Sequence, residues 1–209
     1  MLHVQTMTIV VGISGGIGSG KSTVSRLFAE CGAAALNADE AARAVTDQPE
    51  VKAALRRRFG DGIFAEDGGV DREILASRVF DTTDPAASLW ERTALEAILH
   101  PAVREHLDRR LAQLRLDGRD LVVLDVPLLF QSKYQDECDH IVFVQTKQET
   151  RRQFVAKRGW TAEELDRREA AQTPLEDKKR QSTEIIENDG DVVRLRAQVQ
   201  AIFRKLTAE

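Results

Sequence analysis

The sequence predicts an α/β fold built around a five-stranded parallel sheet. Short apolar runs alternate along the chain with longer segments of helical periodicity. That alternation favours βα units, in which helices cover both faces of a parallel sheet. Glycines also gather at one such junction, where the first run meets the first helical segment. The expected strands are residues 8–13, 33–36, 120–126, 140–145 and 184–187.

The composition indicates a globular protein with one main core. Of the 209 residues, 42% are hydrophobic and 31% charged, and the net charge of −4 argues against a surface devoted to nucleic acid. No apolar stretch approaches the roughly 18 residues that a membrane span needs, and the N-terminal MLHVQTM lacks the regions of a secretory signal. We therefore expect a cytoplasmic protein, a monomer or weak homo-oligomer, that binds neither nucleic acid nor membrane.

The glycine-rich junction follows the first strand and has the spacing G-x-x-x-x-G-K-S from Gly15 to Ser22. Glycines let successive N–H groups face a phosphate, Lys21 can reach the β- and γ-phosphate oxygens, and the Ser22 hydroxyl can ligate magnesium. A plain glycine-rich turn is the alternative, but the pattern is complete, with a strand before it and a helix after it. The expected nucleotide ligands are Gly15, Gly16, Gly18, Ser19, Gly20, Lys21, Ser22 and Thr23.

Two aspartates stand at or just beyond the ends of expected strands. Asp125 ends the third strand and favours a magnesium site, with a turn cap as the alternative. Val126 follows it where an ATPase that activates water would have Glu. Asp39 follows the second strand and is either a general base for an acceptor hydroxyl or part of a capping region in which Asn37 caps the next helix.

Two long stretches go beyond a minimal βα repeat. Residues 37–119 indicate several helices between the second and third strands and predict a substrate lobe. Residues 147–183 carry many charges and few large apolar side chains, which predicts a lid, with a solvated helical pair as the alternative. The core then comprises residues 7–36, 120–146 and 184–209.

Pro101 interrupts a helical pattern within the expected lobe. Because proline disfavours the helical conformation of the residue before it, we expect one helix to end near Leu99 and another to begin at Pro101. Such a break would present His100 and free N–H groups to an anion. In the expected lid, most of the nine Lys and Arg residues between 151 and 180 should be solvated or paired, with one or two directed at the phosphates.

The order of motifs resembles the dephospho-CoA kinase family over essentially the whole chain from Met7 onward. The matching stretches are GISGGIGSGKSTV, NADEAAR, FGDGIFAEDGGVDREILASRVF, LEAILHP, VVLDVPLLF, RREAAQTPLEDK and IIENDG. The phosphate loop alone is shared by many proteins, whereas LEAILHP together with VVLDVPLLF is much more specific. The resemblance implies transfer of the ATP γ-phosphoryl group to the ribose 3′-hydroxyl of dephospho-CoA, by a P-loop core with a helical CoA lobe and a helical lid.

The resemblance also implies site residues and Mg²⁺ as the metal. Asp39 becomes the base, and Ser22 and Asp125 serve magnesium. Asp39, Arg43, His100 and Arg168 lie on the acceptor side, while Arg158 and Asn188 join the ATP site, the latter near the adenine. The chain departs from the family's usual residues at Asn37 (usually Asp), Gln131 (usually Glu), and Arg151 and Phe154 (often Gln and Arg).

Other classes remain as alternatives. A different small P-loop kinase, for nucleotides or shikimate-like metabolites, would share the loop and Asp125 but not LEAILHP or the long insertion. A regulatory GTPase would need an N-K-x-D stretch to read guanine, and the sequence contains none. A binding module that has lost catalysis is disfavoured by intact Lys21, Ser22, Asp39 and Asp125.

Overall fold

A computed structural model of the chain describes residues 7–80 and 84–208. The chain divides into two compact units. The first comprises Met1–Asn37 together with Leu111–Glu209, and the second comprises Ala38–Arg110. Residues 1–6, part of the stretch expected to carry no secretory signal, lie outside the described residues.

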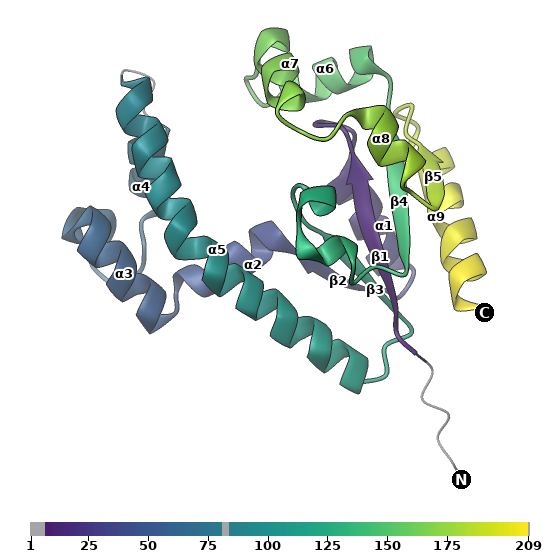
Figure 1. Cartoon of the computed structure of the whole chain (residues 1–209), viewed down its shortest axis with the longest axis horizontal. Helices are drawn as coiled ribbons and strands as arrows, with labels where there is room; N and C mark the ends of the chain where they lie inside the picture. The colour runs from purple at the N-terminus through teal and green to yellow at the C-terminus, as the bar shows by residue number, and fades with distance from the viewer. Residues whose placement is uncertain (1–6, 81–83, 209) are drawn as a thin grey trace. The chain divides into compact units, whose positions relative to one another are not determined.

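The first unit contains the five-stranded sheet, and every strand pair in it is parallel (Figure 1). The strand order is β2-β3-β1-β4-β5, so the first strand of the chain lies at the centre. The predicted fold class is therefore confirmed, and each expected strand agrees with an observed one to within two residues. The strands are β1 (Ile9–Gly15), β2 (Ala34–Asn37), β3 (Leu121–Asp125), β4 (His140–Gln145) and β5 (Glu184–Glu187).

Two helices pack together against the sheet, α1 (Lys21–Glu30) and α9 (Val192–Thr207). Phe28 of α1 is fully buried among side chains of β1, β3, β4 and α9. β1 is almost wholly buried, as expected for a central strand covered on both faces. The strand therefore ends at a fixed point, and the glycine-rich loop starts from there.

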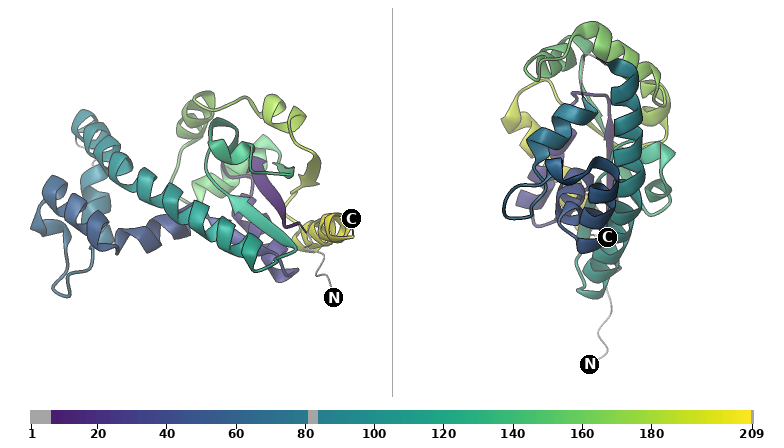
Figure 2. Two further views of the ribbon diagram at one scale, coloured as in Figure 1. Left: turned by 60° about the horizontal axis from the view of Figure 1, so that its bottom comes forward. Right: turned by 90° about the vertical axis from the view of Figure 1, so that its left-hand side faces the viewer.

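Three helices lie between β4 and β5: α6 (Gln148–Ala156), α7 (Ala162–Ala170) and α8 (Leu175–Arg180). α6 and α7 lie beyond the end of the sheet at which β1 finishes, and α8 passes back alongside the sheet, in contact with β1 (Figures 1 and 2). Val155 and Leu165 are buried, so α6 and α7 each have an apolar anchor despite their many charges. Two short 3₁₀ helices, Leu129–Gln131 and Lys133–Gln135, follow β3.

The second unit is helical and has its own core, in which Leu55 and Ile63 are fully buried. Its helices are α2 (Ala38–Thr46), α3 (Pro49–Phe59), α4 (Arg72–Val79) and the greater part of α5 (Pro85–Leu116). Arg78 donates a hydrogen bond to the Phe59 carbonyl, which joins α4 to the end of α3. Among the described residues, no helix combines the length and apolar character needed to cross a membrane.

The expected helix break at Pro101 is wrong. α5 runs without interruption through His100 and Pro101, so no helix N-terminus faces an anion there. Proline removes one intrahelical hydrogen bond and disfavours the helix. Side chains on both sides of it, Leu99 before and Ala102 after, pack on the same apolar cluster of the second unit. This packing holds both halves of the helix in one direction and offsets the local cost.

Candidate active site

The glycine-rich loop joins β1 to α1 with the backbone conformations that its glycines allow. Gly18 and Gly20 have φ angles of 73° and 90°, in the left-handed region that favours glycine. At Gly20, an added Cβ would also collide with the side-chain amide of Asn188. α1 then begins at Lys21, so its N-terminal N–H groups and their partial positive charge adjoin the loop. This arrangement is suited to a bound phosphate.

Lys21 turns back over the loop. Its Nζ donates to the Gly16 carbonyl at 2.9 Å and lies 3.4 Å from that of Gly15. Burial lowers the pKa of Lys21 from 10.5 to about 8, while the charge of Asp125 opposes this shift. The positive charges of Lys178 and Arg158 lower the pKa further. The negative charges of Asp125 and Glu169 therefore compensate only in part for burial of the loop lysine, and a triphosphate would supply more negative charge.

ATP binding should take up protons at alkaline pH. With a pKa of about 8, roughly half of the Lys21 side chains are neutral at pH 8, and phosphate charges will favour the protonated form. We expect about half a proton to be taken up per ATP bound at pH 8, and much less at pH 6.5, where Lys21 is already charged. Calorimetry in buffers of different ionisation enthalpy measures this. Lys21→Arg, which stays charged, is the control; equal uptake by both proteins would contradict the prediction.

Two side chains hold one carbonyl of the loop. Thr146 Oγ1 and Asn188 Nδ2 both donate to the Ser19 oxygen, at 2.9 and 2.8 Å. Because a trans peptide is planar, fixing this C=O on one side directs the Gly20 N–H to the opposite side. Asn188 thus supports the phosphate loop, while its predicted contact with adenine stays a prediction. Sequence reasoning assigned Thr146 no role, although this residue directly follows the end of β4.

Removing the Thr146 hydroxyl should weaken ATP binding. A neutral hydrogen bond contributes about 0.5–1.5 kcal/mol, so Thr146→Val should raise the KM for ATP roughly 3- to 10-fold with little change in melting temperature. Thr146→Ser keeps the donor and is the matched control. Steady-state kinetics with ATP as the varied substrate measure the effect; equal KM values for the two variants would show that the hydroxyl plays no part.

Asp125 and Asn37 lie side by side at the ends of β3 and β2, where the strand register pairs them. Asn37 Nδ2 donates to Asp125 Oδ2 at 3.1 Å. Asn37, which stands where the family usually has Asp, thus orients the Asp125 carboxylate. No group of three or more His, Cys, Asp or Glu able to hold a metal occurs within residues 7–80 and 84–208. The Asp125 carboxylate is an oxygen ligand of the kind that Mg²⁺ prefers, and Mg²⁺ commonly takes one or two carboxylates together with substrate phosphates.

Among the cations of residues 147–183, three lie within electrostatic reach of the loop. Arg158 and Lys178 affect the pKa of Lys21, and Arg151 packs against the loop glycines Gly16 and Gly18. Lys178 is buried, and its Nζ donates to Gln172 Oε1 at 2.8 Å. Sequence reasoning noted Arg151 only as a departure from the family pattern and did not single out Lys178, because charge alone does not distinguish either residue from its exposed neighbours.

Arg168, expected on the acceptor side, contacts other residues of the same segment. Its guanidinium lies 4.0 Å from the centre of the Trp160 ring, and it hydrogen-bonds Glu164 at 2.7 and 3.0 Å. Gln131, another departure from the family pattern, lies 3.5 Å from the hydroxyl of Thr173.

The remaining predicted acceptor residues belong to the second unit. Asp39 lies exposed in the first turn of α2, and Arg43 follows one turn later on the same helix face. The backbone carbonyl of Arg43 accepts a hydrogen bond from Arg72 at 3.4 Å. His100 is exposed in the middle of α5. Asp39 and Arg43 can therefore act on one bound molecule, and the role of each stays a prediction.

Comparison with known proteins identifies the family. The family model of dephospho-CoA kinase matches residues 9–194. The chain belongs to the dephospho-CoA kinase family. The dephospho-CoA kinase of Symbiobacterium thermophilum is 41% identical over 197 residues, which cover 93% of this chain and 80% of that relative. That of Bacillus thuringiensis subsp. konkukian is 39% identical over 201 residues, covering 95% and 98%.

A solved structure shares the fold over nearly the whole chain. A crystal structure from Thermus thermophilus superposes with a TM-score of 0.70 at 35% identity, and the match covers 96% of this chain and 98% of that one. The family model and the two relatives confirm the sequence resemblance over nearly the whole chain. Dephospho-CoA kinases are ATP-dependent phosphotransferases, so the family implies ATP and dephospho-CoA as substrates.

Proposed function

We propose that this protein transfers the γ-phosphoryl group of ATP to the ribose 3′-hydroxyl of dephospho-CoA, giving coenzyme A and ADP. The observation that carries the proposal is a complete phosphate loop, with Lys21 folded over it, in a chain matched by the dephospho-CoA kinase family from residue 9 to 194. A loop of this kind binds the phosphates through backbone N–H groups and positions them by its rigidity.

On the nucleotide side, the loop from Gly15 to Thr23 holds the phosphates and Lys21 places its charge on the β- and γ-phosphates. Ser22, the second residue of α1, and Asp125, at the end of β3, would hold Mg²⁺, Asp125 through water. A bound Mg²⁺ would neutralise charge on the phosphate oxygens. Asn37 supports this role because its amide fixes the orientation of the Asp125 carboxylate.

On the acceptor side, Asp39 would take the proton of the 3′-hydroxyl while that oxygen bonds to the γ-phosphorus and the bond from the γ-phosphorus to the bridging oxygen breaks, releasing ADP. Asp39 follows the end of β2 by two residues in the chain. Arg43 and His100 would bind anionic groups of the acceptor, and Arg168 would join them from α7.

We propose that α6, α7 and α8, within residues 147–183, form the lid. A kinase must keep water from the γ-phosphoryl group, because water would otherwise accept it. Arg158 lies close enough to affect the pKa of Lys21, which supports a role in stabilising charge on the transferred group.

A substrate panel tests the proposed acceptor. Purified protein with ATP and Mg²⁺ should phosphorylate dephospho-CoA at least about 100-fold more efficiently than shikimate or any nucleoside monophosphate, because the site would hydrogen-bond groups that the others lack. Coupled measurement of ADP release gives kcat/KM for each acceptor. Preference for a nucleoside monophosphate or shikimate would replace the proposal with another small P-loop kinase, and ATP turnover without any acceptor would contradict both.

A further inference from the structure

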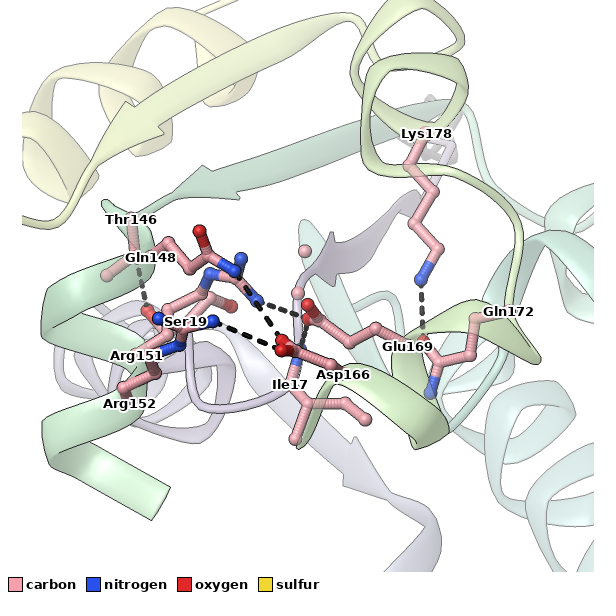
Figure 3. A network of polar contacts seen from close by, with 12 residues as sticks. Ile17, Ser19, Thr146, Gln148, Arg151, Arg152, Asp166, Glu169, Gln172 and Lys178 are labelled. Carbon is pink, nitrogen blue, oxygen red and sulfur yellow. Dashed lines mark hydrogen bonds and ion pairs between the residues drawn. The ribbon is translucent and has the colours of Figure 1, made fainter. Parts of the chain in front are cut away.

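A carboxylate from the proposed lid binds the backbone of the phosphate loop. Glu169, near the end of α7, accepts a hydrogen bond from the Ile17 N–H at 3.0 Å through its Oε1. The same oxygen accepts a hydrogen bond from Nη1 of Arg151, which comes from α6. Figure 3 shows these three residues converging from three segments of the chain. We call this set the Glu169 clasp.

Arg151 of the clasp is buried, Glu169 is largely covered, and both pack closely against the loop. The side chains of Arg151 and Glu169 are only 5% and 17% exposed. A Cβ added to Gly16 would lie 2.8 Å from Arg151 Nη1 and 3.0 Å from Glu169 Oε1, so the pair rests directly on the loop backbone. Glu169 also opposes the lowering of the pKa of Lys178 and of Lys21. Its charge therefore acts on several cations around the loop.

A second ion pair joins the same two helices and provides a contrast. Arg152 of α6 and Asp166 of α7 lie 3.1 Å apart, with side chains 44% and 49% exposed. Exposed pairs contribute little to stability, and Asp166 accepts its hydrogen bonds from two residues of α6, Arg152 and Gln148. Removing one partner of the buried pair, in contrast, leaves the other charge buried and uncompensated.

We propose that Glu169 and Arg151 are positioning residues for phosphoryl transfer: the clasp fixes the Ile17 peptide and couples the conformation of the phosphate loop to α6 and α7. The inference rests on the proposed function, because it assumes that this loop positions ATP for transfer. Sequence reasoning treated Glu169 only as one charge of this segment and noted Arg151 only as a departure from the family pattern. Arg151 stands where the family often has Gln, and a Gln there would not form this ion pair.

The test compares Glu169→Gln and the double variant R151M/E169L with Asp166→Asn as the matched control. The double variant removes both buried charges together, and apolar replacement of a buried pair often preserves folding. We expect kcat/KM for ATP to fall roughly 10- to 100-fold in both clasp variants, because small displacements of a positioning group have effects of this size. The KM for dephospho-CoA and the melting temperature of R151M/E169L should change little, and D166N should match the wild type.

Affinity for a non-hydrolysable ATP analogue, measured without acceptor, should also fall in both clasp variants and stay at the wild-type level in D166N. A folded R151M/E169L protein with wild-type kcat/KM and wild-type affinity for the analogue would overturn the proposed role of the clasp. An equal loss in D166N would also overturn it, because any contact between α6 and α7 would then have this effect. The analogue measurement does not depend on the acceptor, so loss of binding in clasp variants of a protein inactive on dephospho-CoA would refute the proposed acceptor and leave the clasp supported.

Discussion

Lys21→Ala is expected to lower kcat for phosphoryl transfer by about 10²–10³-fold, since removal of one preorganised donor to developing charge has this effect. Lys21 lies against the loop carbonyls, with its Nζ 2.9 Å from the Gly16 oxygen. Burial disfavours its charged form, which the lowered pKa of about 8 shows. The unliganded protein therefore gains little stability from this charge, and the melting temperature should stay the same or rise. We therefore expect the Lys21 charge to act on the bound nucleotide and to contribute little to the stability of the fold.

Turnover with dephospho-CoA and a thermal melt on the same preparation measure both effects. Lys205→Ala on α9 is the control, because Lys205 is exposed and forms an ion pair with Glu184 of β5. It should keep wild-type turnover. Near-normal turnover of the Lys21→Ala protein would overturn the assignment of the phosphate loop.

Asp39→Asn should lower turnover by about 10²–10⁴-fold, with the affinity for ATP little changed, if Asp39 is the general base. Asparagine keeps the size of the side chain and a carbonyl oxygen but does not accept the proton. Asp39 lies in the first turn of α2, where an acidic residue also interacts favourably with the helix dipole. If it only stabilised this helix end, asparagine would serve almost as well and activity would barely change.

Glu40→Gln is the matched control, because Glu40 is the next residue in the same exposed first turn. Its turnover should stay within about twofold of the wild type, as the helix-dipole contribution of one charge is small. An Asp39→Asn protein that keeps more than about a third of wild-type turnover would rule out the base.

Much of the first unit could be predicted from local sequence patterns. The apolar runs that became β1, β3 and β4 are continuous because these strands are buried on both faces, and the phosphate loop has a spacing set by its own backbone. The helix at Pro101 could not be predicted in this way. Its continuity depends on packing against a cluster formed by α3 and α4, which no local rule describes.

The supports of the phosphate loop could not be predicted either. Thr146 and Asn188 meet Ser19 across 127 and 169 residues of sequence, and Glu169 meets Ile17 across 152. The resemblance singled out Asn188 for a contact with adenine, but the hydrogen bond to Ser19 emerged only from the fold. Composition identified the charged segment between β4 and β5, yet only the fold distinguishes the buried Arg151 from the exposed Arg152 beside it.

Phosphorus NMR of the product tests the proposed reaction most directly. The purified protein is given Mg²⁺, dephospho-CoA and ATP whose γ-phosphoryl oxygens carry a heavy isotope, which shifts the phosphorus resonance. The labelled species are then separated. The label should appear in one phosphomonoester at the ribose 3′ position of the acceptor, in a product identical to coenzyme A, with one ADP formed for each product molecule. Label found only in inorganic phosphate, or at any other position of the acceptor, would contradict the proposed transfer.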